Sequence, residues 1–344
     1  MALLVVAPRN LLAVAGGVKW HPYQWRNQGR KNAFIFLSSL GLFPKPFVNK
    51  LSHLKSKSIC SCLRNENAKM DSEEDEEEEF RVLIAVSSKY NDIMIVDTPT
   101  SRFLLLDSTH NVHSVVNKGG EKWTGSYWDE FASLPAIVPQ GPIAIYGLGG
   151  GTAAHLILES WPSLQLEGWE IDEILIDKAR EYLGLSDLER LTQAGGRLLV
   201  RIDDALSPLE DVSTKYAGII IDLFSNGKVL TELQEVATWF DLSKRLMPNG
   251  RLMVNCGDID GASDAIDGKP RLKLPDATWV QNSTVKALSQ AFPLQVSWKR
   301  MPESQGQNFL ALTGGFPDLA SWSAAVPSCL SESVKQWRPC EPLP

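Results

Sequence analysis

The sequence predicts an α/β protein in which a doubly wound parallel sheet follows a small antiparallel β domain. Beyond Pro142, short apolar runs alternate with amphipathic segments, a pattern typical of strands and helices that build a parallel sheet. Between residues 81 and 106, apolar and polar side chains alternate with a period of two, which indicates half-buried strands. A glycine-rich loop at residues 147–152 joins the first apolar run to the first helix and predicts a ligand-binding turn.

The expected elements follow from the apolar runs and the turn residues between them. The small β domain, residues 81–115, is expected to hold strands near 82–86, 93–96 and 103–106. A helix predicted at 126–134 is expected to stop at Pro135. The large domain, residues 116–320, is followed by an expected C-terminal tail, 321–344. In the large domain we expect strands at 143–146, 164–170, 198–202, 217–222 and 250–255, helices near 152–160, 173–183, 229–246 and 279–291, and a final strand pair near 294–300 and 308–313.

Residues 1–65 differ from the rest of the chain in charge. They contain ten Lys and Arg, several serines and no Asp or Glu, which is typical of an organelle transit peptide. A secretory signal is the alternative, but Pro8 and Arg9 interrupt its apolar run. The length of the segment favours a plastid, so we expect the protein in the chloroplast stroma. Residues 66–80 are rich in acids and are expected to be a disordered linker.

Charge and cysteine pattern argue against several classes of partner. All 41 acids but only 24 basic residues lie after residue 65, which gives that part a net charge of −17. Nucleic acids and anionic membranes bind clustered Lys and Arg, so we expect neither as a partner. A cationic substrate would be attracted instead. The five cysteines show no Cys-x-x-Cys spacing, so we expect no disulfide framework and no metal site.

The glycine loop and the acid after the next strand predict a nucleoside site. Gly147, Gly149 and Gly151 let the backbone approach a ligand closely. Glu170 follows about twenty residues later, beside Asp172, where a carboxylate accepts hydrogen bonds from ribose hydroxyls. Two alternatives stay open. The loop also suits a tight turn without a ligand, and residues 149–154 fit the dinucleotide pattern G-x-G-x-x-A.

Three further acids lie at predicted strand ends on the same edge of the sheet. Asp203 and Asp204 follow the strand at 198–202, and one of them, preferably Asp204, is expected to reach an adenine amino group. Asp203 has the alternative role of a helix cap. Asp222 ends a very apolar run, where partial desolvation would make it a better proton acceptor. We therefore expect Asp222 to be the general base, with a helix N-cap as its alternative role.

Eight short motifs follow one another along the chain, at residues 88–93, 105–107, 126–129, 147–152, 170–173, 203–205, 216–222 and 244–250. Together, in this order and spacing, they resemble the spermidine synthase family of aminopropyltransferases. The resemblance spans about residues 82–313 and includes the small β domain ahead of the nucleotide fold.

The resemblance implies a Rossmann-like domain that binds decarboxylated S-adenosylmethionine, and a homodimer. It implies aminopropyl transfer to a small-molecule amine in polyamine biosynthesis. Glu170 would take the ribose position, Asp204 the adenine position, and Asp222 that of the acid that deprotonates and orients the attacking amine. Asp129 would lie near a diamine, and Tyr90 stands in the family's tyrosine position.

The chain departs from the family pattern at several positions near the substrate. The family's glycine loop has an Asp where this chain has Gly150. Ser225, a candidate substrate residue, replaces the second acid of an Asp-Ser-Ser-Asp-Pro motif, and Asn91 and Asn111 each replace a glutamine. Each lost carboxylate removes a charge-assisted hydrogen bond of roughly 1.5–3 kcal/mol. Gly150 also removes an anion that would repel the carboxylate of S-adenosylmethionine. An S-adenosylmethionine-dependent methyltransferase with another acceptor and a catalytically weakened binding protein are therefore the alternatives.

Overall fold

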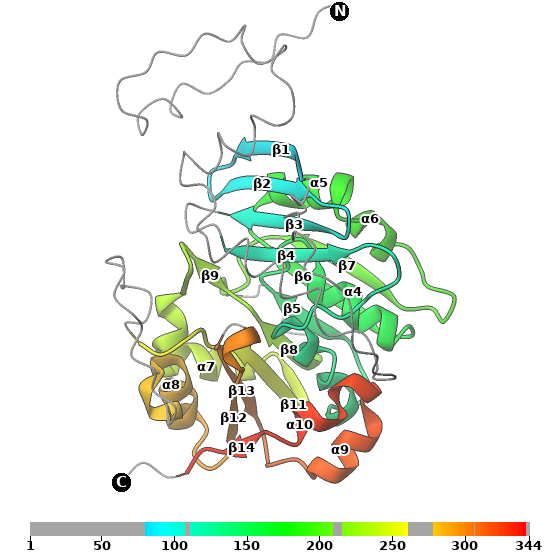
Figure 1. Cartoon of the computed structure of the whole chain (residues 1–344). Coiled ribbons are helices and arrows are strands. Elements are labelled where there is room, and N and C mark those ends of the chain that lie inside the picture. Colours follow the sequence, from blue (N-terminus) through cyan, green and yellow to red (C-terminus); the bar gives the residue numbers. More distant parts are fainter. Residues whose placement is uncertain (1–79, 107–110, 209–214, 261–277, 306, 342–344) are drawn as a thin grey trace, which may run out of the picture. The chain divides into compact units, whose positions relative to one another are not determined.

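The computed structural model describes residues 80–106, 111–208, 215–260, 278–305 and 307–341 (Figure 1). These residues belong to one unit, Glu76–Pro344. The predicted transit peptide and residues 66–79 of the predicted linker lie outside the described residues, so both stay predictions. Among the helices of the described ranges, none has the length and apolar character that a membrane crossing needs.

Within the described residues, a four-stranded antiparallel sheet comes first and confirms the predicted small β domain. It has one strand more than expected, at residues 112–117. Adjacent strands pair in the order β1-β2-β3-β4, and residues 88–91 form the tight turn between the first two. The strands are β1 (Arg81–Ser87), β2 (Asp92–Asp97), β3 (Ser101–Leu106) and β4 (Val112–Asn117).

The large sheet has eight strands in the order β14-β12-β13-β11-β8-β5-β6-β7 (Figure 1). Strands β11, β8, β5, β6 and β7 run parallel, which confirms the doubly wound arrangement, and β13, β12 and β14 extend it with antiparallel pairs. The strands are β5 (Ile143–Tyr146), β6 (Gln165–Glu170), β7 (Arg197–Ile202), β8 (Tyr216–Ile221), β11 (Leu246–Asn255), β12 (Val296–Arg300), β13 (Phe309–Thr313) and β14 (Arg338–Pro339).

Two apolar cores lie on the two faces of this sheet, because successive residues of a strand point to opposite faces. Ile143 and Ile145 of β5 belong to one core, and Ala144 and Tyr146 to the other. The first core is covered by α3 (Trp128–Phe131), α4 (Thr152–Ser160), α5 (Glu173–Tyr182), α6 (Leu185–Leu188), α9 (Leu319–Ala325) and α10 (Ser331–Val334). The second is covered by α7 (Val236–Ser243) and α8 (Ser283–Ala291).

Two predicted helices have less than half of the expected length. Asn226 and Gly227 adopt positive φ angles of 49° and 71°, and this turn joins β9 (Phe224–Ser225) to β10 (Lys228–Val229). The helix predicted at 229–246 is therefore reduced to a 3₁₀ turn, η4 (Thr231–Gln234), and α7. Pro135 does not end the helix predicted at 126–134. It lies inside a 3₁₀ helix, η3 (Leu134–Ile137), that follows α3, because proline is tolerated in a first helical turn.

The C-terminal residues are part of the fold, unlike the predicted tail. The indole of Trp322 donates to the carbonyl of Ser133 at 2.9 Å and its ring lies 5.9 Å from that of Trp337. β14 then pairs with β12 at the edge of the large sheet. The sequence signal for this packing is an apolar residue at every third or fourth position, namely Trp322, Val326, Leu330, Val334 and Trp337, all of them buried.

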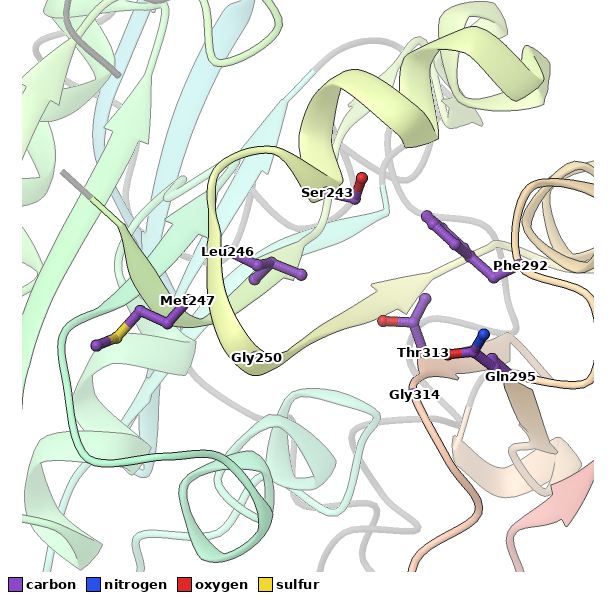
Figure 2. A pocket seen from close by; sticks show the side chains of 8 residues that line it. All are labelled: Ser243, Leu246, Met247, Gly250, Phe292, Gln295, Thr313 and Gly314. Atoms are coloured by element: carbon purple, nitrogen blue, oxygen red, sulfur yellow. The ribbon is translucent and has the colours of Figure 1, made fainter. Parts of the chain in front are cut away.

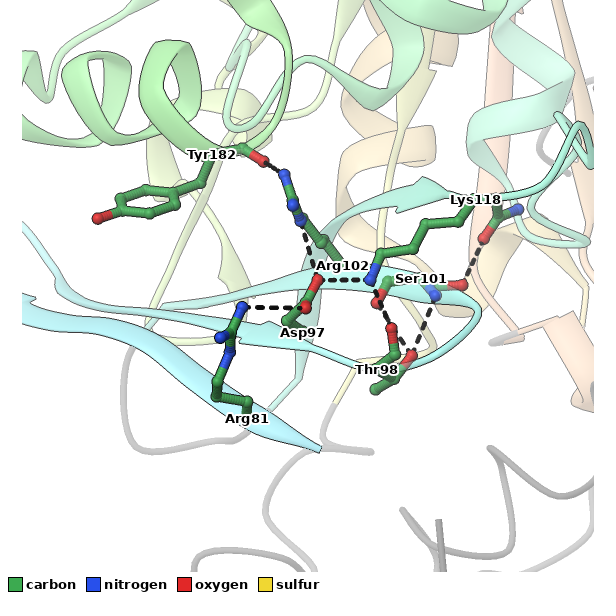
Figure 3. A network of polar contacts seen from close by, with 8 residues as sticks. Arg81, Asp97, Thr98, Ser101, Arg102, Lys118 and Tyr182 are labelled. Carbon is green, nitrogen blue, oxygen red and sulfur yellow. Dashed lines mark hydrogen bonds and ion pairs between the residues drawn. The ribbon is translucent and has the colours of Figure 1, made fainter. Parts of the chain in front are cut away.

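A polar network joins the small sheet to α5 (Figure 3). Asp97 of β2 accepts hydrogen bonds from Arg102 Nε at 2.9 Å and Lys118 Nζ at 2.6 Å, and Arg81 lies 3.6 Å away. The hydrogen bond from Lys118 is the main reason that the pKa of Asp97 is lowered. Arg102 also donates to the carbonyl oxygen of Tyr182, at the end of α5, at 2.7 Å. The small sheet is thereby held beside the helix that follows β6.

Candidate active site

The candidate site lies where the strand order of the large sheet reverses, between β5 and β8. From β5 the chain builds outward to β6 and β7 and then returns to β8 on the other side. Ligands of open α/β sheets bind at the carboxyl ends of strands at such a point. Gly147 leaves β5 here with a φ of +83°, and a Cβ on it would lie 2.3 Å from the backbone oxygen of Asp222. Only glycine lets these two strand ends come so close.

The backbone amides of the glycine loop are already bonded within the protein. Gly149 N–H donates to Glu170 Oε2 at 3.0 Å, and Gly150 N–H to Ser114 Oγ at 2.8 Å. Gly151 N–H donates to the carbonyl of Leu148 at 3.0 Å. A dinucleotide site needs amides at the loop to approach a pyrophosphate. The loop of this chain offers none of these three, which argues against the dinucleotide alternative.

Glu170 lies at the end of β6 with a half-buried carboxylate facing the loop. Besides Gly149, it accepts a hydrogen bond from Asp172 N–H at 3.2 Å. Burial raises the pKa of Glu170, and the backbone hydrogen bonds oppose this shift. Each carboxylate oxygen can accept a further hydrogen bond. Glu170 is thus fixed in orientation with acceptor capacity to spare, which fits a nucleoside ribose.

Asp172 is buried and committed to the fold. Its Oδ1 accepts from Leu175 N–H at 3.2 Å as the N-cap of α5. Its Oδ2 accepts from Ser88 Oγ at 2.5 Å and from Asn91 Nδ2 at 2.8 Å. Asp172 therefore anchors the β1–β2 turn to the start of α5. Tyr90, at the tip of that turn, is 46% exposed.

Asp203 and Asp204 follow β7 with exposed side chains. Asp204 Oδ1 accepts from Leu206 N–H at 2.9 Å, while Asp203 Oδ1 accepts from the amide of Asp204 at 2.8 Å. The turn is held from below by the buried Arg245, which donates to the carbonyls of Ala205 and Ser207. Both acids stay candidates for adenine recognition. Each also accepts a hydrogen bond from a backbone amide of the turn that it belongs to.

Asp222 is the centre of a hydrogen-bond network at the mouth of β8. Its Oδ2 accepts from the hydroxyl of Tyr127 at 3.1 Å, and its Oδ1 from Asn255 Nδ2 at 2.8 Å. Asn255 Oδ1 in turn accepts from Asn308 Nδ2 at 2.9 Å and Gly257 N–H at 3.1 Å. A phenol and an amide, both of them neutral, thus orient the carboxylate, and the indole of Trp128 is a further neutral donor.

Burial raises the pKa of Asp222 to about 6, against the opposing hydrogen bonds from Asn255, Tyr127 and Trp128. Tyr127, which is desolvated and lies beside this carboxylate, has its own pKa raised well above the usual value. The phenol therefore stays a donor at neutral pH, and Asp222 becomes a base whose pKa lies close to the working range. Such a pairing is what general-base catalysis needs.

Sequence reasoning missed the partners of Asp222. The tyrosine that contacts Asp222 is Tyr127, which belongs to the motif at 126–129 but was assigned no role of its own. Asn255 could have been found as the polar residue that ends the apolar strand predicted at 250–255. Asn308 carries no such signal, because only β13 folding back beside β11 brings it there.

The other two predicted substrate residues lie in different surroundings. Asp129 is 8% exposed, and its carboxylate accepts from Thr124 N–H, Thr124 Oγ1 and Gly125 N–H at 2.7–2.9 Å. Burial raises its pKa, and these hydrogen bonds oppose the shift. Asp129 therefore fixes the loop that precedes Tyr127. Ser225 is exposed, at the β9–β10 turn close in sequence to Asp222.

Gly150 is kept small by packing. A Cβ at this position would lie 2.6 Å from Leu183 Cδ1 and 2.7 Å from Ser114 Cβ. The side chain of any larger residue would start toward α5 and β4. The absence of an acid at Gly150 is therefore accompanied by a packing constraint, since a larger side chain there would displace Leu183 or Ser114.

Two surface pockets lie on other parts of the large domain. One, of about 190 Å³, is lined by Ser243, Leu246, Met247, Gly250, Phe292, Gln295, Thr313 and Gly314 (Figure 2). The other, of about 370 Å³, includes Arg251, Asp318 and Trp322. The start of β11 and the end of β13 border the first pocket, opposite the end of the sheet that holds Asp222. The candidate site is therefore assigned from its chemistry rather than from cavity size.

Within the part of the chain that the structure describes, no three His, Cys, Asp or Glu side chains are grouped to hold a metal ion. The acids described above each bond to backbone amides, hydroxyls or side-chain amides. Proton transfer at Asp222 and hydrogen bonding at Glu170 are the chemistry that these side chains offer.

The chain is similar in sequence to a curated protein but not to any family model. No protein-family model matches the chain. In sequence it is similar to a probable polyamine aminopropyl transferase of Bifidobacterium longum (strain NCC 2705), with 25% identity over 182 residues. The match covers 52% of this chain and only 38% of the length of that relative.

Two solved structures are similar to this chain. A probable spermidine synthase from Corynebacterium glutamicum ATCC 13032 has a TM-score of 0.50 at 17% identity, over 70% of this chain and 84% of that one. A spermidine synthase from Thermotoga maritima has a TM-score of 0.47 at 15% identity, over 74% and 88%. The described residues thus have a fold like that of the probable spermidine synthase from Corynebacterium glutamicum. The predicted resemblance to the spermidine synthase and polyamine aminopropyltransferase family is confirmed.

Proposed function

We propose that this chain is a spermidine-synthase-like transferase. Its co-substrate is a sulfonium nucleoside, decarboxylated S-adenosylmethionine or S-adenosylmethionine, and its lead reaction is aminopropyl transfer to an amine in polyamine biosynthesis. The observation that carries the proposal is Asp222, a buried carboxylate at the switch point of the sheet with a pKa raised to about 6. It shares the carboxyl edge of the sheet with the glycine loop and Glu170.

The nucleoside would be held by residues that follow strands β5, β6 and β7 at the carboxyl edge of the large sheet. Glu170 would accept the ribose hydroxyls, Gly147 and Gly149 let the backbone approach, and Asp204, with Asp203, would bind the adenine. Bound there, the sulfonium supplies a carbon that is electrophilic because the neighbouring sulfur is positively charged.

The transfer needs a base and alignment rather than a nucleophile from the protein. The acceptor amine forms a bond to the carbon next to sulfur while the carbon–sulfur bond breaks, and a neutral thioether leaves. Asp222 takes the proton that the amine nitrogen must lose. Tyr127 and Asn255 hold the carboxylate in one orientation, so that its free lone pairs point at the incoming amine.

Methyl transfer is the second candidate, because position 150 places no carboxylate in the glycine loop. Without that anion, S-adenosylmethionine and its decarboxylated form are both admissible. The same base would serve an acceptor with an ionisable N–H or O–H group. A homodimer in the chloroplast stroma, with a small-molecule acceptor, completes the proposal.

Isothermal calorimetry with each co-substrate in parallel tests the proposal. We expect at least one sulfonium nucleoside to bind, and competition by adenosine to weaken that binding. Binding of the decarboxylated form alone would favour aminopropyl transfer, and binding of S-adenosylmethionine alone would favour methyl transfer. A folded protein that binds neither would contradict the proposal and leave a catalytically weakened protein as the remaining reading.

A further inference from the structure

We propose that a buried cluster of Glu130, Lys299 and Ser333 is a positioning device that fixes the hydroxyl of Tyr127 on Asp222. The three residues, named here the 130–299–333 cluster, come from α3, β12 and α10. The inference rests on the proposed function only in so far as Asp222 is assigned as the base. It gives the C-terminal helices a role in catalysis that no sequence motif indicates.

The cluster is an ion pair closed by a hydroxyl in the interior. Glu130 and Lys299 are each 2% exposed, and Lys299 Nζ lies 2.8 Å from Glu130 Oε1. Lys299 also donates to the carbonyl oxygen of Ser333 at 3.0 Å and to its hydroxyl. The hydroxyl of Ser333 donates to Glu130 Oε1. Three elements distant in sequence therefore meet at one carboxylate oxygen.

Stability alone is a poor explanation for this cluster. Removing two charges from water is costly, and well-packed apolar residues of similar volume often serve a core as well or better. Desolvation lowers the pKa of Lys299, and the pairing with Glu130 offsets this only in part. Glu130 Oε2 is buried and finds no hydrogen-bond donor among the described residues. An ion pair with hydrogen bonds fixes the relative orientation of the side chains that form it, and an apolar contact does not.

Helix α3 connects the cluster to the active site, so that fixing Glu130 also fixes the orientation of Tyr127. Tyr127 is the N-cap residue of this four-residue helix, and Glu130 lies three positions further on. One helical turn has too few internal hydrogen bonds to hold its own orientation. Asp129 ties the start of α3 to residues 124 and 125, and Glu130 ties it to β12 and α10. The two anchors together fix where the Tyr127 hydroxyl meets Asp222.

The test is a double-mutant cycle read on the pKa of Asp222, because this readout requires neither co-substrate nor acceptor. The pKa is measured by carbon-13 NMR on protein labelled at Asp carboxyl carbons, with Asp222→Asn identifying the resonance. Tyr127→Phe removes a donor to the carboxylate and therefore raises the pKa of Asp222. We expect a rise of about 0.5–1 unit, a three- to tenfold change in the protonation equilibrium, in the intact protein.

The same substitution is then made in the charge-neutral variant Glu130→Gln/Lys299→Met. There, Tyr127→Phe should raise the pKa of Asp222 by less than about half of the rise seen in the otherwise wild-type protein, because the hydroxyl is no longer held in place. Ser333→Ala, which keeps the ion pair, should give an intermediate value and serves if the double variant does not fold. Val334→Ala, beside the cluster on α10, removes buried apolar packing only and should leave the full effect of Tyr127→Phe.

An equal effect of Tyr127→Phe in the wild-type, Ser333→Ala and cluster-variant backgrounds would overturn the proposal. Reduction of the effect by Val334→Ala to the same extent would do so as well, since general loosening would then explain it. Failure of the proposed function appears separately, as absence of co-substrate binding in a protein whose Asp222 and Tyr127 remain coupled.

Discussion

Asp222 gains its basicity at the expense of folding stability. Burial places its folded-state pKa at about 6, above the usual value of 3.8. A raised pKa means that the protonated carboxyl favours the folded state. The favourable contribution is complete below about pH 3.8 and is lost as the pH rises through about 6. At neutral pH the buried charge therefore costs up to roughly 3 kcal/mol.

Asp222→Asn is accordingly expected to stabilise the protein at pH 8. Asparagine keeps the shape and can still bond to Tyr127 and Asn255, but it carries no charge to desolvate. Urea denaturation should show a gain of roughly 1–3 kcal/mol at pH 8 and little difference at pH 4. A variant that is less stable than the wild type at pH 8 would show that Asp222 is a structural cap.

Glu170 gives a second prediction, on affinity. Glu170→Ala should weaken binding of the sulfonium nucleoside by roughly 1.5–3 kcal/mol in calorimetry, because the ribose loses a charged acceptor. The substitution also frees the Gly149 amide, so Glu170→Gln is the matched control, since it keeps that hydrogen bond but not the charge. Unchanged affinity in both variants would remove Glu170 from the site.

At the scale of elements, the glycine loop is held between β4 and β6. Thr152 adds to the bond between Gly150 and Ser114, because its hydroxyl accepts from Val115 N–H at 2.8 Å and donates to Val115 O at 3.0 Å. The small sheet thereby orients the start of α4. The packing of Gly150 against Ser114 is part of this junction.

Gly150→Ala is expected to destabilise the protein by roughly 1–3 kcal/mol through overpacking. The matched control is Gly315→Ala, because a Cβ on Gly315 meets nothing within 4 Å and its φ is not positive. Thermal unfolding of the two variants separates them. Equal melting temperatures would mean that Gly150 has room for a side chain and that its role is purely electrostatic.

The junction between the small sheet and α5 predicts acid sensitivity. The lowered pKa of Asp97 adds stability above its unfolded value of 3.8, and this contribution is lost as the pH falls through the folded-state pKa. Asp97→Asn should therefore cost about 1 kcal/mol at pH 7, and the difference should shrink toward pH 3. Asp241→Asn, in an exposed pair with Lys244, is the control and should change little. A pH-independent loss for Asp97→Asn would contradict this account.

At the scale of the whole molecule, local patterns predicted the parallel strands and the edge where the acids gather. β5 and α4 have the predicted bounds, because a glycine loop between an apolar run and an amphipathic helix leaves little freedom. The roles of single acids were harder to predict. The carboxylate of Asp129 accepts hydrogen bonds from a loop, and that of Asp172 caps a helix. Whether a carboxylate faces the backbone or a ligand depends on how the folded chain packs around it.

Contacts distant in sequence explain the remaining differences. Tyr127 and Asp222 are 95 residues apart, and Glu130 and Ser333 are 203 apart. No local periodicity encodes such pairs. The C-terminal residues are another case, because Trp322 contacts Ser133 and Trp337, and β14 pairs with β12 at the edge of the large sheet.

The central claim is that Asp222 is the base of a sulfonium-dependent transfer, and its most direct test is turnover by Asp222→Asn. The assay supplies decarboxylated S-adenosylmethionine or S-adenosylmethionine, whichever binds, with 1,4-diaminobutane and a panel of primary amines as acceptors. We expect kcat to fall by about 10²–10⁴-fold with the co-substrate affinity unchanged, because the amide cannot take the proton. Turnover equal to that of the wild-type protein would contradict the claim.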